Sequence, residues 1–167
     1  MPLTPFHFGP GAVIHCVAPK RISFLSFCMA NVLIDIEPLY FILTNNPPLH
    51  RFFHTYIGAT LVALATSILF LACLRFASRF WLPNLFKWQG LSLSSVVIGA
   101  AFGTYSHIVL DSIMHSDIQP FSPFTQENSL LHLLSMSALH WLCVASGVLG
   151  AAVVMVTRIM WRGKDAL

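Results

Sequence analysis

The sequence predicts an all-α integral membrane protein, a polytopic helical bundle that forms one domain over residues 1–167. Two observations carry this prediction. Hydrophobic residues make up 56% of the chain, charged residues make up 9% and the mean hydropathy is +0.75, whereas soluble domains contain about 25% charged residues. In addition, the chain contains long apolar stretches without Asp, Glu, Lys or Arg, and membrane-spanning helices have this composition.

Two short apolar helices are expected first, over residues 6–18 and 22–36, separated by Pro19-Lys20-Arg21. A helix of about 15 residues rises only about 22 Å, which is less than the thickness of about 30 Å of a hydrocarbon core. We therefore expect a short helical hairpin in this region. The turn residues Asn45-Asn46-Pro47-Pro48 then favour a loop over residues 38–49.

Three strong transmembrane helices are expected after this loop, at residues 54–75, 91–115 and 131–157. Each lies largely within a stretch that lacks charged residues, and about 20 helical residues are enough to cross the hydrocarbon core. Residues 117–123 contain two prolines, which cannot continue a helix, so this segment is expected to form a loop.

Basic residues indicate how the helices are oriented, because Lys and Arg collect in short cytoplasmic loops. If Lys20 and Arg21 lie in the cytoplasm and the segments alternate, eight of the nine Lys and Arg residues lie on that side, and Arg51 is the exception. We therefore predict a multi-pass protein of the inner membrane with a cytoplasmic C-terminus. The same alternation places five of the six acidic residues on the opposite face: Asp35, Glu37, Asp111, Asp117 and Glu127.

Charge and cysteine content bear on the expected partners. The formal net charge of +3 is small and dispersed, so no nucleic-acid partner is expected, and membrane lipids are the expected surroundings. The four cysteines lie far apart and form no CxxC pair: Cys16, Cys28, Cys73 and Cys143. They predict neither a disulfide framework nor a thiolate metal site.

Paired histidine and aspartate residues on two helices form the candidate chemical site. His107 and Asp111 are four residues apart and so lie on one face of a helix, as do His50 and His54 at the start of another. Such groups are costly to bury unpaired in a membrane, and they mark functional sites more often than surface charges do. Two helices that present these pairs can bring four ligands to one divalent cation, with zinc favoured and manganese or iron as alternatives.

Further candidate ligands are expected in the same layer: His7, Asp35, Glu37 and His115. Their convergence favours a metal site, because each adds an imidazole or carboxylate to the same region. The alternative is that His107 and Asp111 form only a buried hydrogen-bonded pair that holds two helices together.

Four patches of the sequence resemble one bacterial family. They are Met1-Pro-Leu-Thr-Pro-Phe-His7-Phe-Gly-Pro10, Asp35-Ile-Glu-Pro38, His50-Arg-Phe-Phe-His54-Thr55, and Ser106-His-Ile-Val-Leu-Asp111 continuing to His115-Ser-Asp117. In this order they resemble the bacterial inner-membrane proteins classed as metal-dependent hydrolases, the LexA-binding membrane-bound hydrolase group. More remotely, the order of His, Asp, His and HxxxD is similar to that of the zinc-dependent phospholipase C and single-strand nuclease superfamily, which is all-helical and holds a cluster of metals.

The resemblance implies a set of ligands for one metal ion: Asp35, His54 (or His50), His107 and Asp111. It also implies that His7 and a shared Asp111 contact a second ion, and that His115 begins a third site. The superfamily completes that third site with a later HxxxE pair, which is missing after His132 and His140. We therefore expect one or two ions.

Metal-dependent hydrolysis at the non-cytoplasmic face of a bacterial inner membrane is the favoured function. A bound cation lowers the pKa of a water molecule and polarises a phosphoryl or acyl oxygen. Glu37 or Asp117 is the candidate proton acceptor, and Arg51 is the candidate anchor for developing negative charge. The depth of the site suggests a lipid-like or phosphoester substrate.

Two alternatives come from other classes of protein. A transporter also places His and Asp within spanning helices, and its polar residues are expected to continue to the opposite face of the membrane. A haem-binding or metal-binding membrane subunit uses axial histidines near the middle of the membrane without carboxylates beside them.

Overall fold

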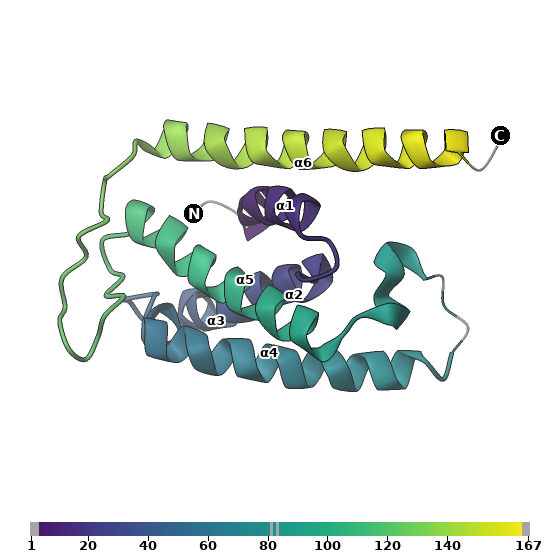
Figure 1. Cartoon of the computed structure of the whole chain (residues 1–167). Coiled ribbons are helices and arrows are strands. Elements are labelled where there is room, and N and C mark those ends of the chain that lie inside the picture. Colours follow the sequence, from purple (N-terminus) through teal and green to yellow (C-terminus); the bar gives the residue numbers. More distant parts are fainter. Residues whose placement is uncertain (1–3, 81, 83, 165–167) are drawn as a thin grey trace.

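The computed structural model describes residues 4–80, 82 and 84–164, and this part of the chain is all-helical without a strand, as predicted (Figure 1). The ends of the predicted domain, residues 1–3 and 165–167, lie outside the described residues. The helices, with η marking 3-10 helices, are η1 (Thr4–His7), α1 (Phe8–Val17), α2 (Phe24–Ile34), α3 (Ile36–Leu43), η2 (Phe52–His54), α4 (Tyr56–Ala77), η3 (Leu85–Gly90), α5 (Leu93–Met114) and α6 (Met136–Lys164).

Among the described residues, four helical stretches are long and apolar enough to cross a membrane: Phe24–Leu43, Tyr56–Ala77, Leu93–Met114 and Met136–Thr157. The last three correspond to the three strong spans that the sequence predicts. The first combines α2 and α3, so the described part of the chain has one candidate span more than the three strong helices that the sequence predicts.

The segment that follows Asp35 differs from the prediction. The predicted hairpin of α1 and α2 is present. The prediction of a loop over residues 38–49 is wrong for its first half, because α3 continues to Leu43. Pro38 lies in the first turn of α3, where its missing N–H has no helical partner to lose. The backbone N–H of Leu39 donates to the carbonyl of Asp35, which joins α3 directly to the end of α2.

Three of the long helices begin later than predicted because a hydroxyl residue caps each of them. The side chain of Thr55 accepts from the N–H of Gly58 at the start of α4, and Ser92 caps α5 in the same way. Ser135 accepts from the N–H of Ala138, so α6 begins at Met136 and not at residue 131.

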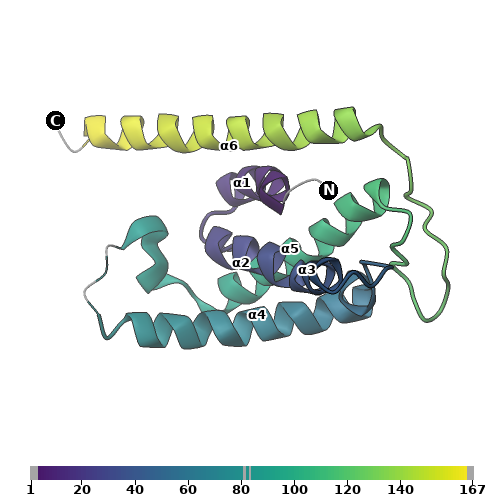
Figure 2. The same ribbon diagram turned by 180° about the vertical axis from the view of Figure 1, so that it is seen from behind.

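The helices pack as a layered bundle with α5 in the middle. α5 packs against α2 and α4, while α6 packs against α1, and views from two opposite sides show the same order (Figures 1 and 2). α2 and α5 approach closely, because a Cβ atom at Gly99 would collide with the carbonyl oxygen of Ser23, and Gly103 faces Phe27 in the same way. Small residues thus allow the two backbones to touch.

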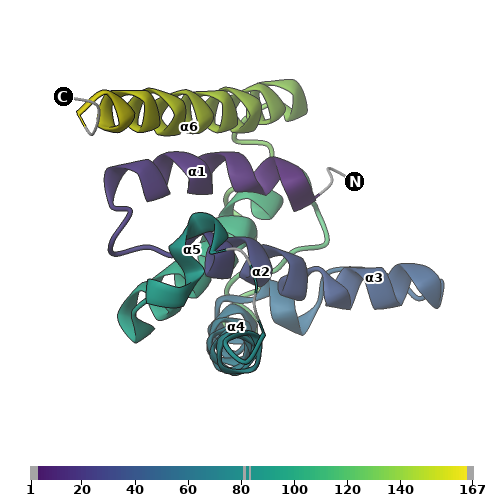
Figure 3. The same cartoon turned by 90° about the vertical axis from the view of Figure 1, so that its right-hand side faces the viewer.

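One end of this bundle gathers the candidate site. The end of α2, the start of α4 and the C-terminal turns of α5 meet there, and α3 projects sideways from the bundle near the same end (Figures 1 and 3). This arrangement brings Asp35, His54 and Asp111 together, although they are distant in the sequence.

Candidate metal centre

Four side chains from three parts of the fold converge on one point. Asp35 lies between α2 and α3, His54 ends η2 just before α4, and His107 and Asp111 lie one turn apart on α5. One ligand atom from each lies within 4.8 Å of the others. His54, His107 and Asp111 are buried, and the side chain of Asp35 is 27% exposed, so the cluster opens on the side of Asp35.

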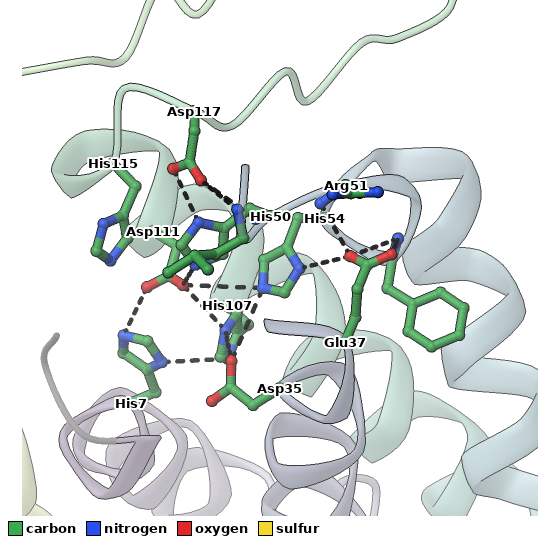
Figure 4. Close-up of polar contacts among 12 residues, drawn as sticks. His7, Asp35, Glu37, His50, Arg51, His54, His107, Asp111, His115 and Asp117 are labelled. Carbon is green, nitrogen blue, oxygen red and sulfur yellow. Dashed lines mark hydrogen bonds and ion pairs between the residues drawn. The ribbon is translucent and has the colours of Figure 1, made fainter. Parts of the chain in front are cut away.

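The distances between these ligand atoms match the size of a tetrahedral cation site. His107 Nε2 lies 3.1 Å from Asp35 Oδ1 and 3.2 Å from Asp111 Oδ2 (Figure 4). His54 Nε2 lies 3.8 Å from the same oxygen of Asp35 and 3.9 Å from the same oxygen of Asp111. Ligands that surround a zinc ion tetrahedrally at about 2.0–2.1 Å are about 3.3 Å apart. Two of the four distances are therefore slightly shorter than the expected value, and two are somewhat longer.

Buried polar atoms in the cluster also lack ordinary partners. Among the described residues, the Nε2 atoms of His54 and His107 have no hydrogen-bond partner of acceptable geometry, although carboxylate oxygens lie close to both. Such atoms are costly to bury unless a proton, water or metal satisfies them. Asp35 and Asp111 also bring two carboxylates within 4.8 Å of each other, which favours a cation between them. The residues present thus fit a divalent cation.

Hydrogen bonds behind the histidines direct their Nε2 atoms toward the cluster. His54 Nδ1 lies 3.3 Å from Glu37 Oε2, and a carboxylate can only accept, so a neutral His54 ring carries its proton on Nδ1. His107 Nδ1 lies 3.1 Å from Asn31 Oδ1, and the Asn31 amide nitrogen donates to the carbonyl of Phe27, which fixes the amide orientation. Metal-binding histidines commonly have this arrangement.

A second group of possible ligands shares Asp111. His50, Asp111 and His115 each offer an atom within 4.8 Å of the others. His50 Nε2 lies 3.9 Å from Asp111 Oδ2, while His50 Nδ1 lies 2.9 Å from Asp117 Oδ1. His7 reaches the same carboxylate from η1, with its Nε2 3.2 Å from Asp111 Oδ1. All seven residues predicted as metal ligands therefore lie in or beside one cluster (Figure 4).

Burial and charge set the protonation of the groups that lie outside the candidate spans. Burial lowers the pKa of His50 and of His115, which favours neutral rings. Burial also lowers the pKa of His54, but its contacts with Asp35 and Glu37 outweigh this effect and raise the pKa above its usual value. Burial raises the pKa of Asp117, yet the hydrogen bonds from His50 outweigh it and hold that pKa below its usual range.

The three residues predicted as catalytic lie around the cluster and not at its centre. Glu37 accepts from the backbone N–H groups of Arg51 and Phe53 and contacts the ring of His54. Asp117 accepts from the backbone N–H groups of Leu49 and His50 as well as contacting the ring of His50. The carboxylates of Glu37 and Asp117 thus each contact three nitrogen atoms.

Arg51 points away from the ligands. Its guanidinium donates to the carbonyl oxygens of Pro48 and Asn46 and lies 3.7 Å from the centre of the Phe41 ring. It therefore orders the loop before η2 and joins that loop to α3.

Sequence reasoning missed Asn31, which is fully buried and contacts His107. The available signal was an amide in the middle of an apolar segment, where a polar side chain needs a specific partner. Its partner lies 76 positions away, so the contact itself was not visible in the sequence.

Comparison with known proteins returns no matching family model, no matching curated protein and no matching solved structure.

Proposed function

We propose that this chain is a membrane-bound, metal-dependent hydrolase whose divalent cation is held by Asp35, His54, His107 and Asp111. The observation that carries the proposal is the convergence of four ligand atoms with tetrahedral spacing, two of them buried Nε2 atoms without a hydrogen-bond partner among the described residues. Zinc suits two imidazoles and two carboxylates, and manganese or iron also accept this set. A cation bound there supplies an acidified water molecule and polarises a phosphoryl or acyl oxygen.

The surrounding residues hold the ligands in position. In this proposal Glu37, Asp117 and Asn31 keep the protons of three histidines on Nδ1, so that each Nε2 lone pair faces the cluster. This is a positioning role for Glu37 and Asp117, in place of the proton-accepting role expected from the sequence. Arg51 acts through the loop that carries His50, because its guanidinium is bonded to that loop.

The alternatives receive less support from the geometry. Polar residues do continue along the bundle, but the hydroxyls of Thr66, Ser67 and Thr104 donate to carbonyls of their own helices, as structural hydroxyls do. A transport path needs groups that are free to bind a passing ion. A haem ligand needs open space on the metal-facing side of its ring, whereas His54 and His107 each face a carboxylate there.

Metal content and hydrolysis measured on the same purified protein test the proposal. We expect bound zinc, manganese or iron after purification without chelators, and hydrolysis of a chromogenic phosphodiester or ester that is lost with chelator and regained with metal. His107→Ala should lose both metal and activity. His15→Ala is the matched control, because His15 contacts the carbonyl of Ile22 outside the cluster. A protein that holds no divalent metal, even after zinc or manganese is added, would refute the proposal.

We also propose that the site lies at the outer face of a bacterial inner membrane and that the substrate is a phosphoester or lipid-like molecule. The distribution of Lys and Arg supports this orientation, and the likeness to inner-membrane hydrolases supports the setting. Reporter fusions after Lys87 and Leu167 should report cytoplasm, and a fusion near Gln119 should report the outer side. A cytoplasmic signal near Gln119 would place the site on the wrong side for this proposal.

A further inference from the structure

Helix α3 begins close to the level at which two other candidate spans end. The residue before it, Asp35, lies 3.8 Å from His54, which is two positions before the first residue of α4. Asp35 also lies 3.1 Å from His107, in the C-terminal part of α5. Length and composition allow α2 and α3 to form one span, but such a span would carry α3 beyond the end of α4.

The direction of α3 also differs from that of the spans. Figure 3 shows α4 end-on, and α3 lies across the same view. The change of direction occurs at Asp35, whose ψ angle of −4° departs from the α-helical value of about −42° and separates α3 from α2. Because α4 is a candidate span, a helix that lies across it runs along the plane of the membrane.

One face of α3 is apolar and exposed. Ile36, Leu39, Tyr40 and Leu43 follow the spacing i, i+3, i+4 and i+7, which places them on one side of a helix, and their exposed fractions run from 50% to 77%. A cluster of large apolar side chains is costly to leave in water. Tyrosine is enriched at the boundary between lipid and water. The composition of this face therefore fits the interfacial layer of a membrane.

A different face of α3 is held by the loop that follows the helix. The guanidinium of Arg51 lies 3.7 Å from the centre of the Phe41 ring, and the carboxylate of Glu37 accepts from the backbone N–H groups of Arg51 and Phe53. The loop is itself polar, because residues 44–46 are Thr-Asn-Asn and are exposed. α3 thus has one side anchored by polar contacts and one apolar, exposed side, as helices that lie in a membrane interface do.

We propose that α3 is an interfacial helix that lies flat in the membrane surface at the end of the bundle that carries the metal cluster, with its apolar face in contact with lipid. Lipid is the partner that the geometry fits, because the neighbouring spans place the membrane boundary at this level. This inference goes beyond the proposed function and does not depend on it. It implies that the open side of the cluster, at Asp35, borders the lipid interface, because the adjacent Ile36 belongs to the apolar face.

The membrane depth of spin labels on α3 tests this inference. Ile36→Cys and Leu43→Cys, made in a chain whose four cysteines are replaced by Ala, are labelled and placed in vesicles of phosphatidylethanolamine and phosphatidylglycerol. Accessibility of each label to oxygen and to a water-soluble nickel complex gives its depth. We expect both labels at one shallow depth, because a helix in the membrane plane keeps its residues level. Ile68→Cys, at a 71% exposed position inside α4, is the deep control, and Asn45→Cys is the water-exposed control.

Two results would overturn the inference. Seven helical residues rise about 10 Å, so a depth difference of about 10 Å between the labels at Ile36 and Leu43 would mean that α3 crosses the membrane with α2. Labels as accessible to the nickel complex as the label at Asn45 would place α3 in water. If Ile36→Cys does not fold, Leu39→Cys replaces it, and a crossing helix then gives a difference of about 6 Å. The depths are measured without metal, so a protein that binds no metal would refute the proposed function and leave this inference standing.

Discussion

The contact between α2 and α5 has polar residues at both of its ends, but the two ends satisfy them differently. At the start of these helices, the hydroxyl of Ser26 donates to the carbonyl of Val96, and the N–H of Ser23 donates to the carbonyl of Ser95. At the other end, the Nε2 atom of His107 faces two carboxylates without a proper hydrogen bond. The first end joins helices through complete hydrogen bonds, whereas the second retains unsatisfied atoms that a ligand can use.

This difference separates polar residues with structural roles from polar residues in a site. Burial alone does not distinguish them, because Ser26 and His107 are both fully buried. What differs is whether the fold itself supplies a partner for each polar atom. We therefore expect substitutions at the His107 end to change metal binding, and substitutions at the Ser26 end to change stability alone.

The largest effect is expected for His107 and Asp111, which a double-mutant cycle can test. If they bind a cation, His107→Ala and Asp111→Ala each remove a ligand, and bound metal should be lost in both single variants and in the double variant. If they bond only to each other, each single change leaves a buried partner unpaired at a cost of roughly 1–3 kcal/mol, and the double change relieves part of it. Thermal stability in detergent and metal content are measured on all four proteins. Unchanged metal content in both single variants would rule out the ligand role.

Glu37→Gln is expected to weaken metal binding without removing a ligand. Glu37 accepts from Phe53 and Arg51 and contacts His54, and an amide cannot accept from all three nitrogen atoms. Loss of such a partner typically lowers metal affinity about 10–100-fold. Competition with a metal-binding dye measures the change, and Glu127→Gln, at an exposed position, is the control. Equal affinities in the two variants would contradict the positioning role.

Gly99→Val is expected to lower stability at the opposite end of the same interface. A Cβ atom at this position collides with the backbone of Ser23, which a side-chain rotation cannot relieve, so α2 and α5 must separate. Overpacking of this kind costs about 1–3 kcal/mol. Thermal unfolding in detergent measures the loss, while the folded fraction should still bind metal. Gly90→Val is the control, because a Cβ atom at Gly90 meets no other atom within 4 Å.

Ser26→Ala is expected to have the smallest effect. It removes the hydrogen bond from Ser26 to Val96, and interhelical hydrogen bonds in membranes are worth about 0.6 kcal/mol on average. Metal content should be unchanged, because Ser26 lies at the end of α2 that does not carry Asp35. A loss of metal in this variant would mean that the two ends are coupled and that Ser26 also supports the site.

The sequence predicted the helical class and three of the long helices, because composition and apolar length are local properties. It did not predict that α3 continues the first apolar segment. Asn45-Asn46-Pro47-Pro48 correctly indicates a turn, but the loop predicted around it also includes Pro38. The place of Pro38 in the first turn of α3 depends on where that helix begins. The same reasoning applies to α6, whose start depends on the cap at Ser135.

The candidate site also combines features that the sequence predicts with features that only the fold creates. The sequence by itself determined that His107 and Asp111 share a helix face, because a spacing of four residues is a local rule of the α-helix. It also determined which residue types were available to bind a cation. The metal itself and the hydrolytic activity stay predictions.

Only the tertiary structure decided which histidine faces which carboxylate and which way each ring is turned. His50 contacts Asp117 across 67 positions of the chain, and His107 contacts Asn31 across 76. These contacts determine which ring nitrogen of each histidine faces the cluster. They form only where α2, α4 and α5 meet. The direction of each histidine lone pair depends on contacts between packed helices, so it cannot be predicted from the local spacing of residues in the sequence.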